Sequence, residues 1–244
     1  ARCDNLKTGS HESRSMDTTI QAAAARLVRR LKEGNHTLTL AESCTGGLLA
    51  STLTDIAGAS SWFKKSYITY ANEAKIQELG VESEALESRG AVSAKVAIQM
   101  AKGALEKADA DFAISVTGIA GPTNEGSSKP VGTVYVGIAS RQWANAIRTQ
   151  IGGTRAENKS GFVYFALLTA MRCWDEAMER VEERQKEALS AIEEARRMEA
   201  EREAERERRD QEAREHAPWQ DEAWSEDDDA AEIGNEVEWV DGEE

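Results

Sequence analysis

The chain has 244 residues and a formal net charge of −14. The charge is unevenly distributed: residues 1–174 contain 20 basic and 16 acidic side chains, whereas residues 175–244 contain 10 basic and 28 acidic ones. Such an acidic extension argues against nucleic acid as a partner. No apolar run approaches the roughly 20 residues that span a bilayer, so we expect no membrane association. The length allows one domain with extensions, or two small domains.

The few cysteines and histidines limit covalent and metal chemistry. The three cysteines are odd in number, far apart and without a C-x-x-C pair, which favours a reducing compartment over a disulfide framework. Local spacing brings no two of the three histidines to one metal. We therefore expect no metal and no cofactor, and a cytoplasmic protein without a signal peptide.

The chain begins with a polar, aperiodic stretch, residues 1–16. Its Gly9-Ser10-His11 resembles the remnant of an expression tag, so we expect a tag or a disordered leader. Residues 17–32 follow with apolar side chains on one helical face, and Gly34-Asn35 ends this predicted helix.

A glycine-rich turn follows the first predicted strand, residues 37–40. The turn contains Ser43 and Cys44 and ends in Gly46-Gly47, and residues 48–53 then favour a buried helix. A serine at a strand-to-helix turn is exposed, and the next backbone N–H groups can hold an anion. A simple capped helix start explains this stretch alone equally well.

Strands and helices then interleave as far as Trp174. Residues 67–70 predict a strand, 72–79 a helix, and Ser93 caps a further helix. Later elements are a buried strand at 112–116, a strand within 130–139, a partner strand at 144–151 and a helix from Arg155. The predicted fold class is α/β, a mixed β-sheet covered by helices, and the domain spans residues 17–174.

The composition changes from Asp175. Residues 174–195 carry a weak 4-3-4-3 apolar rhythm, and residues 199–215 are nearly all Glu, Arg and Ala. We expect a charged helix over 175–215, which could form a coiled coil, and a disordered acidic tail with three tryptophans over 216–244. The extension could recruit a protein partner or simply keep the protein in solution. We also expect a homo-oligomer.

Three loops could carry chemistry, because strand ends in an α/β sheet gather at one edge. They hold Ser43, Lys75 and Thr117 respectively. No histidine lies in a glycine-rich motif, although His36 could serve a Ser-His-Asp triad, so a lysine of depressed pKa is the natural partner of a serine nucleophile. Lys75 is nearest a candidate loop, and the competing bases are Lys64, Lys65 and Lys129. Cys44 is a rival nucleophile or a small buried hydrophobe.

Five blocks occur in the order seen in one family. They are Ala41–Gly47, Tyr70–Lys75, Gly90–Ser93, Thr117–Pro122 and Lys129–Val134. Over roughly Ile20 to Trp174 the chain resembles the CinA C-terminal-domain family, whose best-known members are stand-alone bacterial nicotinamide-nucleotide amidases. The additional N-terminal domain of full-length CinA-type proteins does not precede these blocks, so the resemblance is to the stand-alone form.

The resemblance implies hydrolysis of nicotinamide mononucleotide to nicotinic acid mononucleotide and ammonia in NAD salvage, with a small nucleotide as substrate. It implies that Ser43 is the nucleophile, Lys75 the general base and later acid, and Thr117 a group that polarises or orients the reacting amide. The backbone N–H groups after Ser43 are candidates for the oxyanion hole. Arg155 matches a late arginine that could hold the phosphate. The remaining expected substrate-binding residues are Cys44, Thr45, Gly46, Gly47, Tyr70, Asn72, Gly118 and Gly121.

One block departs from the family pattern. A glycine-rich stretch after Ala-Gly-Pro is replaced by residues 123–126, Thr-Asn-Glu-Gly, which could alter closure over the substrate. The same fold could also serve a non-catalytic nucleotide-binding or regulatory module. That module would bind the nucleotide without releasing ammonia.

Overall fold

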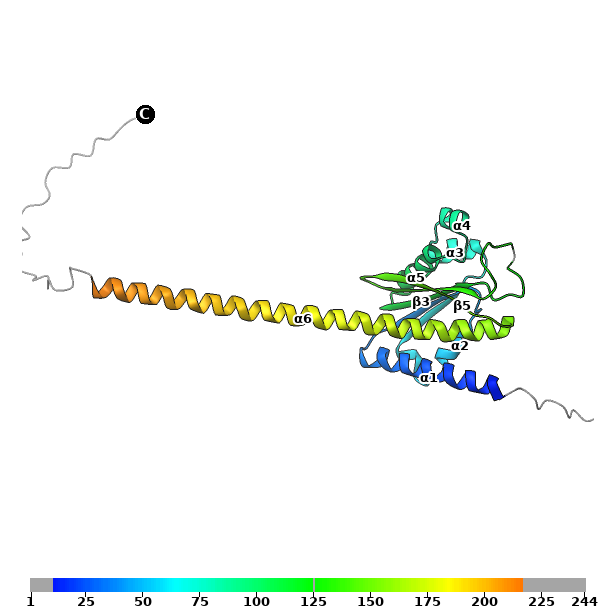
Figure 1. Cartoon of the computed structure of the whole chain (residues 1–244), viewed down its shortest axis with the longest axis horizontal. Helices are drawn as coiled ribbons and strands as arrows, with labels where there is room; N and C mark the ends of the chain where they lie inside the picture. The colour runs from blue at the N-terminus through cyan, green and yellow to red at the C-terminus, as the bar shows by residue number, and fades with distance from the viewer. Residues whose placement is uncertain (1–10, 125, 217–244) are drawn as a thin grey trace, which may run out of the picture. The chain divides into compact units, whose positions relative to one another are not determined.

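A computed structural model describes residues 11–124 and 126–216 (Figure 1). The chain divides into two units, and the first, which ends at Val181, contains a single sheet with helices on both faces. The helices are α1 (His11–Glu33), α2 (Leu48–Thr54), the short 3-10 helix η1 (Ala59–Ser61), α3 (Asn72–Leu79), α4 (Ser83–Arg89), α5 (Ala94–Ala108) and α6 (Arg155–Glu215).

The sheet contains five strands in the order β2-β1-β3-β4-β5. Their bounds are β1 (Leu38–Glu42), β2 (Phe63–Ile68), β3 (Phe112–Gly118), β4 (Thr133–Ser140) and β5 (Ala144–Gln150). Strand β1 is parallel to both β2 and β3, whereas the central strand β3 forms an antiparallel meander with β4 and β5. The mixed α/β class that the sequence predicts is confirmed.

The two faces of the sheet receive different side chains, because alternate residues of a strand point to opposite sides. On β3, Phe112, Ile114 and Val116 belong to the larger core cluster, which also contains buried residues of α1, α2 and the first part of α6. The opposite face carries smaller side chains such as Ala113 and packs against α5.

Small residues let α5 approach the sheet closely. A Cβ atom at Gly137 of β4 would lie only 2.3 Å from the carbonyl oxygen of Ala97 on α5. The hydroxyl of Ser115 donates a hydrogen bond of 2.6 Å to that same oxygen. Helix α5 is therefore fixed over β3 and β4, and this fixes the loop before it, which contributes to the site described below.

Several element boundaries differ from the sequence predictions. The first helix begins at His11, so residues 11–16 are helical and not part of a disordered leader; residues 1–10 lie outside the described residues. Strand β2 spans 63–68, not 67–70, because it pairs with β1 through Lys65 and Ser66. Helix α4 and η1 are additions in stretches that carry no apolar periodicity.

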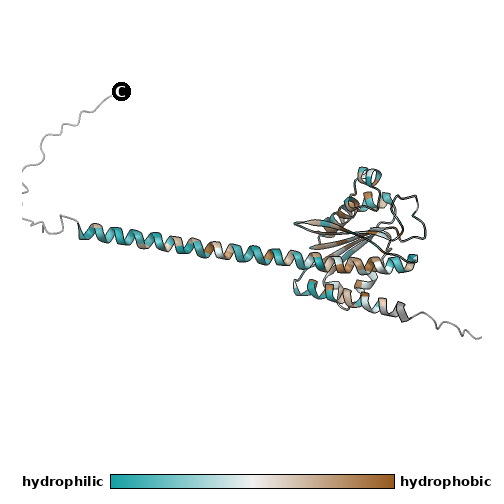
Figure 2. Ribbon diagram, viewed as in Figure 1, coloured by the Kyte–Doolittle hydropathy of each residue, from teal (hydrophilic) through white to brown (hydrophobic). Residues whose placement is uncertain are grey.

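Helix α6 is continuous from Arg155 to Glu215, so the predicted domain helix and charged helix are one element. Its buried residues end at Cys173, and its part from Glu182 onward belongs to the second unit. Hydrophilic side chains dominate that part, although Leu189, Ile192 and Met198 stand exposed on it (Figure 2). The expected coiled coil remains a prediction, and the expected disordered tail lies almost wholly outside the described residues.

Candidate active site

The site forms where the three parallel strands end. Glu42, the last residue of β1, pairs with Ile68 of β2 on one side and with Val116 of β3 on the other. The chain segments that follow these strands therefore emerge side by side at one edge of the sheet, where α/β proteins commonly bind ligands. The register brings together the turn after β1, the link from β2 to α3 and the end of β3.

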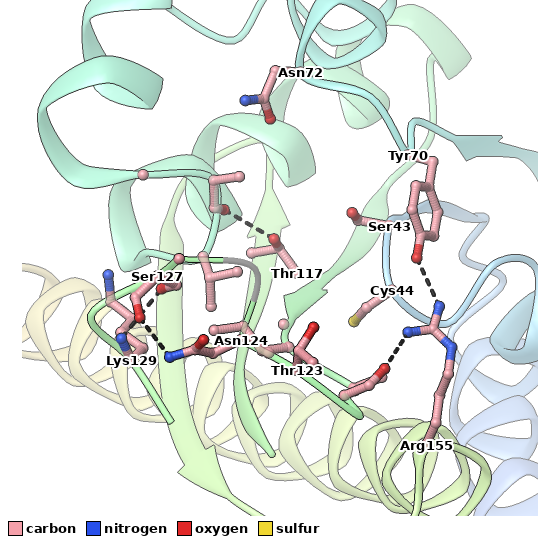
Figure 3. Close-up of a pocket in the computed structure, with 18 of the residues that line it drawn as sticks. Ser43, Cys44, Tyr70, Asn72, Thr117, Thr123, Asn124, Ser127, Lys129 and Arg155 are labelled. Carbon is pink, nitrogen blue, oxygen red and sulfur yellow. Dashed lines mark hydrogen bonds between the residues drawn. The ribbon is translucent and has the colours of Figure 1, made fainter. Parts of the chain in front are cut away.

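A cavity of about 440 Å³ opens at this edge (Figure 3). Nine predicted site residues line it: Ser43, Cys44, Tyr70, Asn72, Lys75, Thr117, Gly118, Gly121 and Arg155. Thr45, Gly46 and Gly47 belong to the same turn as Ser43 but are not among the lining residues. Thr45 is fully buried, and the two glycines lead the backbone away into α2.

The carboxylate of Glu42 organises the turn. Although it is fully buried, it accepts hydrogen bonds from the backbone N–H groups of Gly47, Leu49 and Ala50 at 3.0, 3.1 and 2.8 Å. The negative charge thus occupies the N-terminus of α2, which favours anions. A substrate anion therefore cannot use these three donors.

Only part of the turn's backbone remains open to a ligand. The N–H of Ser43 donates to Val116, that of Gly46 to Ser43 and that of Leu48 to Thr45. The N–H groups of Cys44 and Thr45 donate to no other residue in the described part of the chain. Of the backbone N–H groups that follow Ser43, those of Cys44 and Thr45 therefore remain candidates for the oxyanion hole.

Lys75 is buried, which overturns the alternative of a solvated lysine on a helix. Its side chain is 1% exposed, and its Nζ donates hydrogen bonds to the carbonyl oxygens of Thr69 and Tyr70, both at 2.9 Å, and more weakly to Ala71 at 3.5 Å. Burial lowers the pKa of this amine, because a desolvated ammonium is less stable than a solvated one. A neutral amine has only two N–H groups, so deprotonation leaves a lone pair available to accept a proton.

Ser43 and Cys44 differ in their readiness to react. The Ser43 hydroxyl lies in the cavity wall, and no hydrogen bond joins it to another of the residues that the structure describes. Cys44 is only 5% exposed, and burial raises the pKa of its thiol to about 12. Because the thiolate is the reactive form, this environment disfavours Cys44 as a nucleophile near neutral pH.

Thr117 has a defined hydroxyl orientation. It is 1% exposed, and its Oγ1 donates to the carbonyl oxygen of Ala91 at 2.9 Å (Figure 3). Since the hydroxyl has a single proton, it presents only acceptor lone pairs to the cavity. It is therefore suited to accept a hydrogen bond from an amide NH2 group and cannot at the same time donate one to a carbonyl.

Arg155 joins two walls of the cavity. Its guanidinium donates to the carbonyl oxygen of Gly121 at 2.6 Å and to the hydroxyl of Tyr70 at 2.8 Å. The next turn of α6 adds Asn158, whose amide donates to the carbonyl oxygens of Ala120 and Gly153. The start of α6 thereby fixes the loop that follows β3.

The rival bases fall into two groups. His36 lies against Trp174, with ring centroids 5.0 Å apart, and does not line the cavity, so it cannot complete a triad with Ser43. Lys64 and Lys65 are exposed on β2 and also lie outside the lining. Lys129 does line the cavity, in the loop between β3 and β4.

Sequence reasoning missed several contributors. The block Ala41–Gly47 contains Glu42, but its role is not expected from the block. A glutamate that ends a buried strand directly before a glycine turn is a signal for a helix-capping carboxylate. The Ala91 carbonyl could not have been found, because a backbone acceptor leaves no mark in a sequence. Thr123, Asn124, Gly126 and Ser127 also line the cavity.

No cluster of three His, Cys, Asp or Glu side chains that could hold a metal ion occurs within residues 11–124 and 126–216. None of the helices in this part of the chain has both the length and the apolar character needed to cross a membrane.

The fold and this edge site define an α/β domain with a polar, lysine-containing cavity where its parallel strands end. The model of the CinA C-terminal domain matches residues 20–174, and the chain belongs to that family. The boundaries agree closely with the Ile20–Trp174 span over which the sequence blocks resemble the family.

Two relatives illustrate the relationship. A CinA-like protein from Chlorobium limicola is 47% identical over 159 residues, 63% of this chain, but the match spans only 36% of the relative. The nicotinamide-nucleotide amidohydrolase PncC of Escherichia coli K12 is 42% identical over 154 residues, which are 63% of this chain and 93% of the relative. The chain thus spans about a third of the longer relative and nearly all of the shorter one.

Solved structures show the same fold. The competence/damage-inducible protein CihA from Agrobacterium tumefaciens superposes with a TM-score of 0.61 and 38% identity, over 64% of this chain and 96% of the other. A CinA superfamily protein from Escherichia coli gives a TM-score of 0.61 and 35% identity, over 64% of this chain and 92% of the other.

Proposed function

We propose that this protein is an amidohydrolase that deamidates nicotinamide mononucleotide to nicotinic acid mononucleotide and ammonia, as part of NAD salvage. One observation carries the proposal: a buried lysine of lowered pKa and an unpartnered serine hydroxyl line one cavity. The similarity to a relative named as a nicotinamide-nucleotide amidohydrolase, 93% of which is matched, supports the choice of substrate.

In the first step Ser43 Oγ attacks the carboxamide carbon, and neutral Lys75 accepts the hydroxyl proton. The C–O bond forms while the carbonyl π electrons move onto oxygen. The N–H groups of Cys44 and Thr45 would stabilise this oxyanion, and one such donor typically contributes about 3–4 kcal/mol to the transition state. Lys75 need not touch Ser43 beforehand, because catalytic hydrogen bonds often tighten only when substrate binds.

In the second step the C–N bond breaks, and Lys75 returns the proton to the leaving nitrogen, which departs as ammonia. A water molecule then attacks the acyl carbon while Lys75 accepts its proton. The C–Oγ bond breaks as Lys75 returns that proton to Ser43 Oγ, and the released carboxylic acid loses its own proton to solvent. Lys75 can serve both directions because burial brings its pKa closer to the working pH.

Thr117 would orient the carboxamide. Its lone pairs accept a hydrogen bond from the substrate NH2 group, since its proton is engaged by the Ala91 carbonyl. This role turns the amide so that its carbonyl oxygen points away from Thr117 and towards the backbone donors. Of the two roles expected for Thr117, polarising or orienting the amide, we therefore propose orientation.

The test measures ammonia release from nicotinamide mononucleotide by the full chain, beside Ser43→Ala and Lys75→Met. We expect turnover in the wild type and its loss in both variants, with folding unchanged by circular dichroism. If the wild type binds the nucleotide but yields no product between pH 6 and 10, the chain is a nucleotide-binding module and the proposal is wrong.

A further inference from the structure

The cavity has two cationic ends. Figure 3 shows Lys129 and Arg155 on opposite sides of the view, with Ser43 and Thr117 between them. The described lining residues include no aspartate or glutamate, whereas they include Lys75, Lys129 and Arg155. A cavity of this charge favours an anionic ligand, and the position of its anion depends on which cation is available to bind it.

In Figure 3, more of the labelled lining residues lie on the Lys129 side of Ser43 than on its Arg155 side. The segment before α5 supplies Gly90, Ala91 and Val92, and the chain from Thr117 to Lys129 supplies most of the other lining residues. Tyr70 and Arg155 bound the opposite end. A ligand with its reacting group at Ser43 can therefore extend its remaining atoms along the lining residues on the Lys129 side.

Arg155 is already engaged in the structure. Its hydrogen bonds to the Gly121 carbonyl and the Tyr70 hydroxyl fasten the loop after β3 to the link after β2. Both terminal nitrogens of the guanidinium take part in this clamp, so a phosphate bound here would share them with Gly121 and Tyr70. Its contacts indicate that it shapes the cavity.

Lys129 is in a different situation. Its Nζ donates to a single backbone acceptor, the carbonyl oxygen of Arg89, at 3.3 Å, and it forms no ion pair with the described residues. An ammonium has three donors, so Lys129 retains capacity for an anion. Its half-buried position at the cavity wall increases the strength of such a contact.

The loop around Lys129 offers further polar groups. Ser127 accepts a hydrogen bond from the Lys129 backbone N–H through its Oγ, and Asn124 donates to the Ser127 carbonyl, so the three residues hold one another (Figure 3). Gly126 lies between them with a φ of 80°. These described groups form a polar wall beside Lys129 that offers further hydrogen-bond partners to a phosphate.

We infer that Lys129 binds the phosphate of the nucleotide substrate and confers preference for the nucleotide over its nucleoside, while Arg155 shapes the cavity. This inference rests on the proposed amidohydrolase function and changes the expectation that Arg155 holds the phosphate. The substrate lies with its carboxamide at Ser43 and its phosphate in the lobe lined by Asn124, Ser127 and Lys129.

The experiment compares kcat/KM for nicotinamide mononucleotide and for nicotinamide riboside, which lacks the phosphate. In Lys129→Met we expect the preference for the nucleotide to fall by roughly 10- to 100-fold, the range for a lost hydrogen bond to a charged group, through a higher KM for the nucleotide. The riboside should be unaffected. Lys129→Arg should restore most of the preference, because it keeps the charge.

Two control variants separate the alternatives. Arg155→Met should lower activity on both substrates and keep their ratio, whereas Lys64→Met, which removes an exposed lysine outside the cavity, should change neither. An unchanged ratio in Lys129→Met, a ratio that collapses in Arg155→Met, or a wild type without preference would each overturn the inference.

A binding measurement tests the inference even if the proposed amidohydrolase function is wrong. If the wild type hydrolyses neither substrate, calorimetric titration with nicotinic acid mononucleotide still tests the phosphate contact. Weaker binding to Lys129→Met than to the wild type, with equal binding to Lys64→Met, supports the inference for a binding module. Equal binding to all three proteins overturns it.

Discussion

The two walls of the cavity are built differently. The wall after β1 is buried, and Glu42 fixes its backbone through three hydrogen bonds. The described residues of the wall after β3, 122–124 and 126–129, are largely exposed and depend on a few contacts among Asn124, Ser127 and Lys129. The buried, hydrogen-bonded wall suits bond-breaking chemistry, which needs accurate positioning, whereas the exposed wall suits substrate selection.

The largest effect on activity is expected for Ser43→Ala, on the buried wall. We expect activity to fall to below about one thousandth, because the nucleophile is removed. The melting temperature should stay near that of the wild type, since no hydrogen bond joins the Ser43 hydroxyl to another described residue. Ammonia release measures the effect, and Cys44→Ala is the matched control. Loss of activity in Cys44→Ala with retention in Ser43→Ala would establish a cysteine mechanism instead.

Lys75→Met should lower kcat by about 10²- to 10⁴-fold, the usual contribution of a general acid–base group. In the wild type, activity should rise with pH as the Lys75 ammonium loses its proton. Because burial lowers the pKa of this amine, the rise should occur below the ordinary range of lysine. A kcat profile against pH measures it. A midpoint at or above that ordinary range would contradict Lys75 as the base.

Glu42→Ala should destabilise the protein more than any change on the exposed wall. It leaves three backbone N–H groups of a buried turn without their acceptor, at a cost of about 3 kcal/mol. Asn124→Ala, on the exposed wall, should cost less than about 0.5 kcal/mol. Urea denaturation of both variants makes the comparison. Equal losses in the free energy of unfolding would show that the hydrogen bonds of the buried wall do not stabilise the protein more than those of the exposed wall.

Thr117→Val should lower activity less than Ser43→Ala or Lys75→Met, by roughly tenfold in kcat/KM, because one neutral hydrogen bond to the substrate disappears. Thr117→Ser keeps the hydroxyl and should recover most of the activity. Steady-state kinetics on nicotinamide mononucleotide provide the measurement. If serine fails to recover activity, the methyl group and not the hydroxyl is what the site requires.

Much of the fold could be predicted from the sequence, because local patterns encode it. Apolar periodicity predicts α1, and the run of apolar residues at 112–116 predicts β3, whose buried face matches the expectation. Strand β2 was misplaced because its span is set by pairing with β1 and its own residues are mostly exposed or half-buried. Helix α4 is short and lacks periodicity, so only its contacts with α5 reveal it.

By itself, the sequence determined the candidate groups: a serine in a glycine turn, a lysine without a usable histidine nearby, and the family to which the blocks belong. Tertiary structure alone decided their environments. Strand register and helix packing bring together the residues that bury Lys75, that bond the Glu42 carboxylate to the N-terminus of α2, and that engage Arg155. Electrostatic properties arise from such surroundings and not from residue type, which is why the sequence could propose the cations but could not say how each of them is engaged.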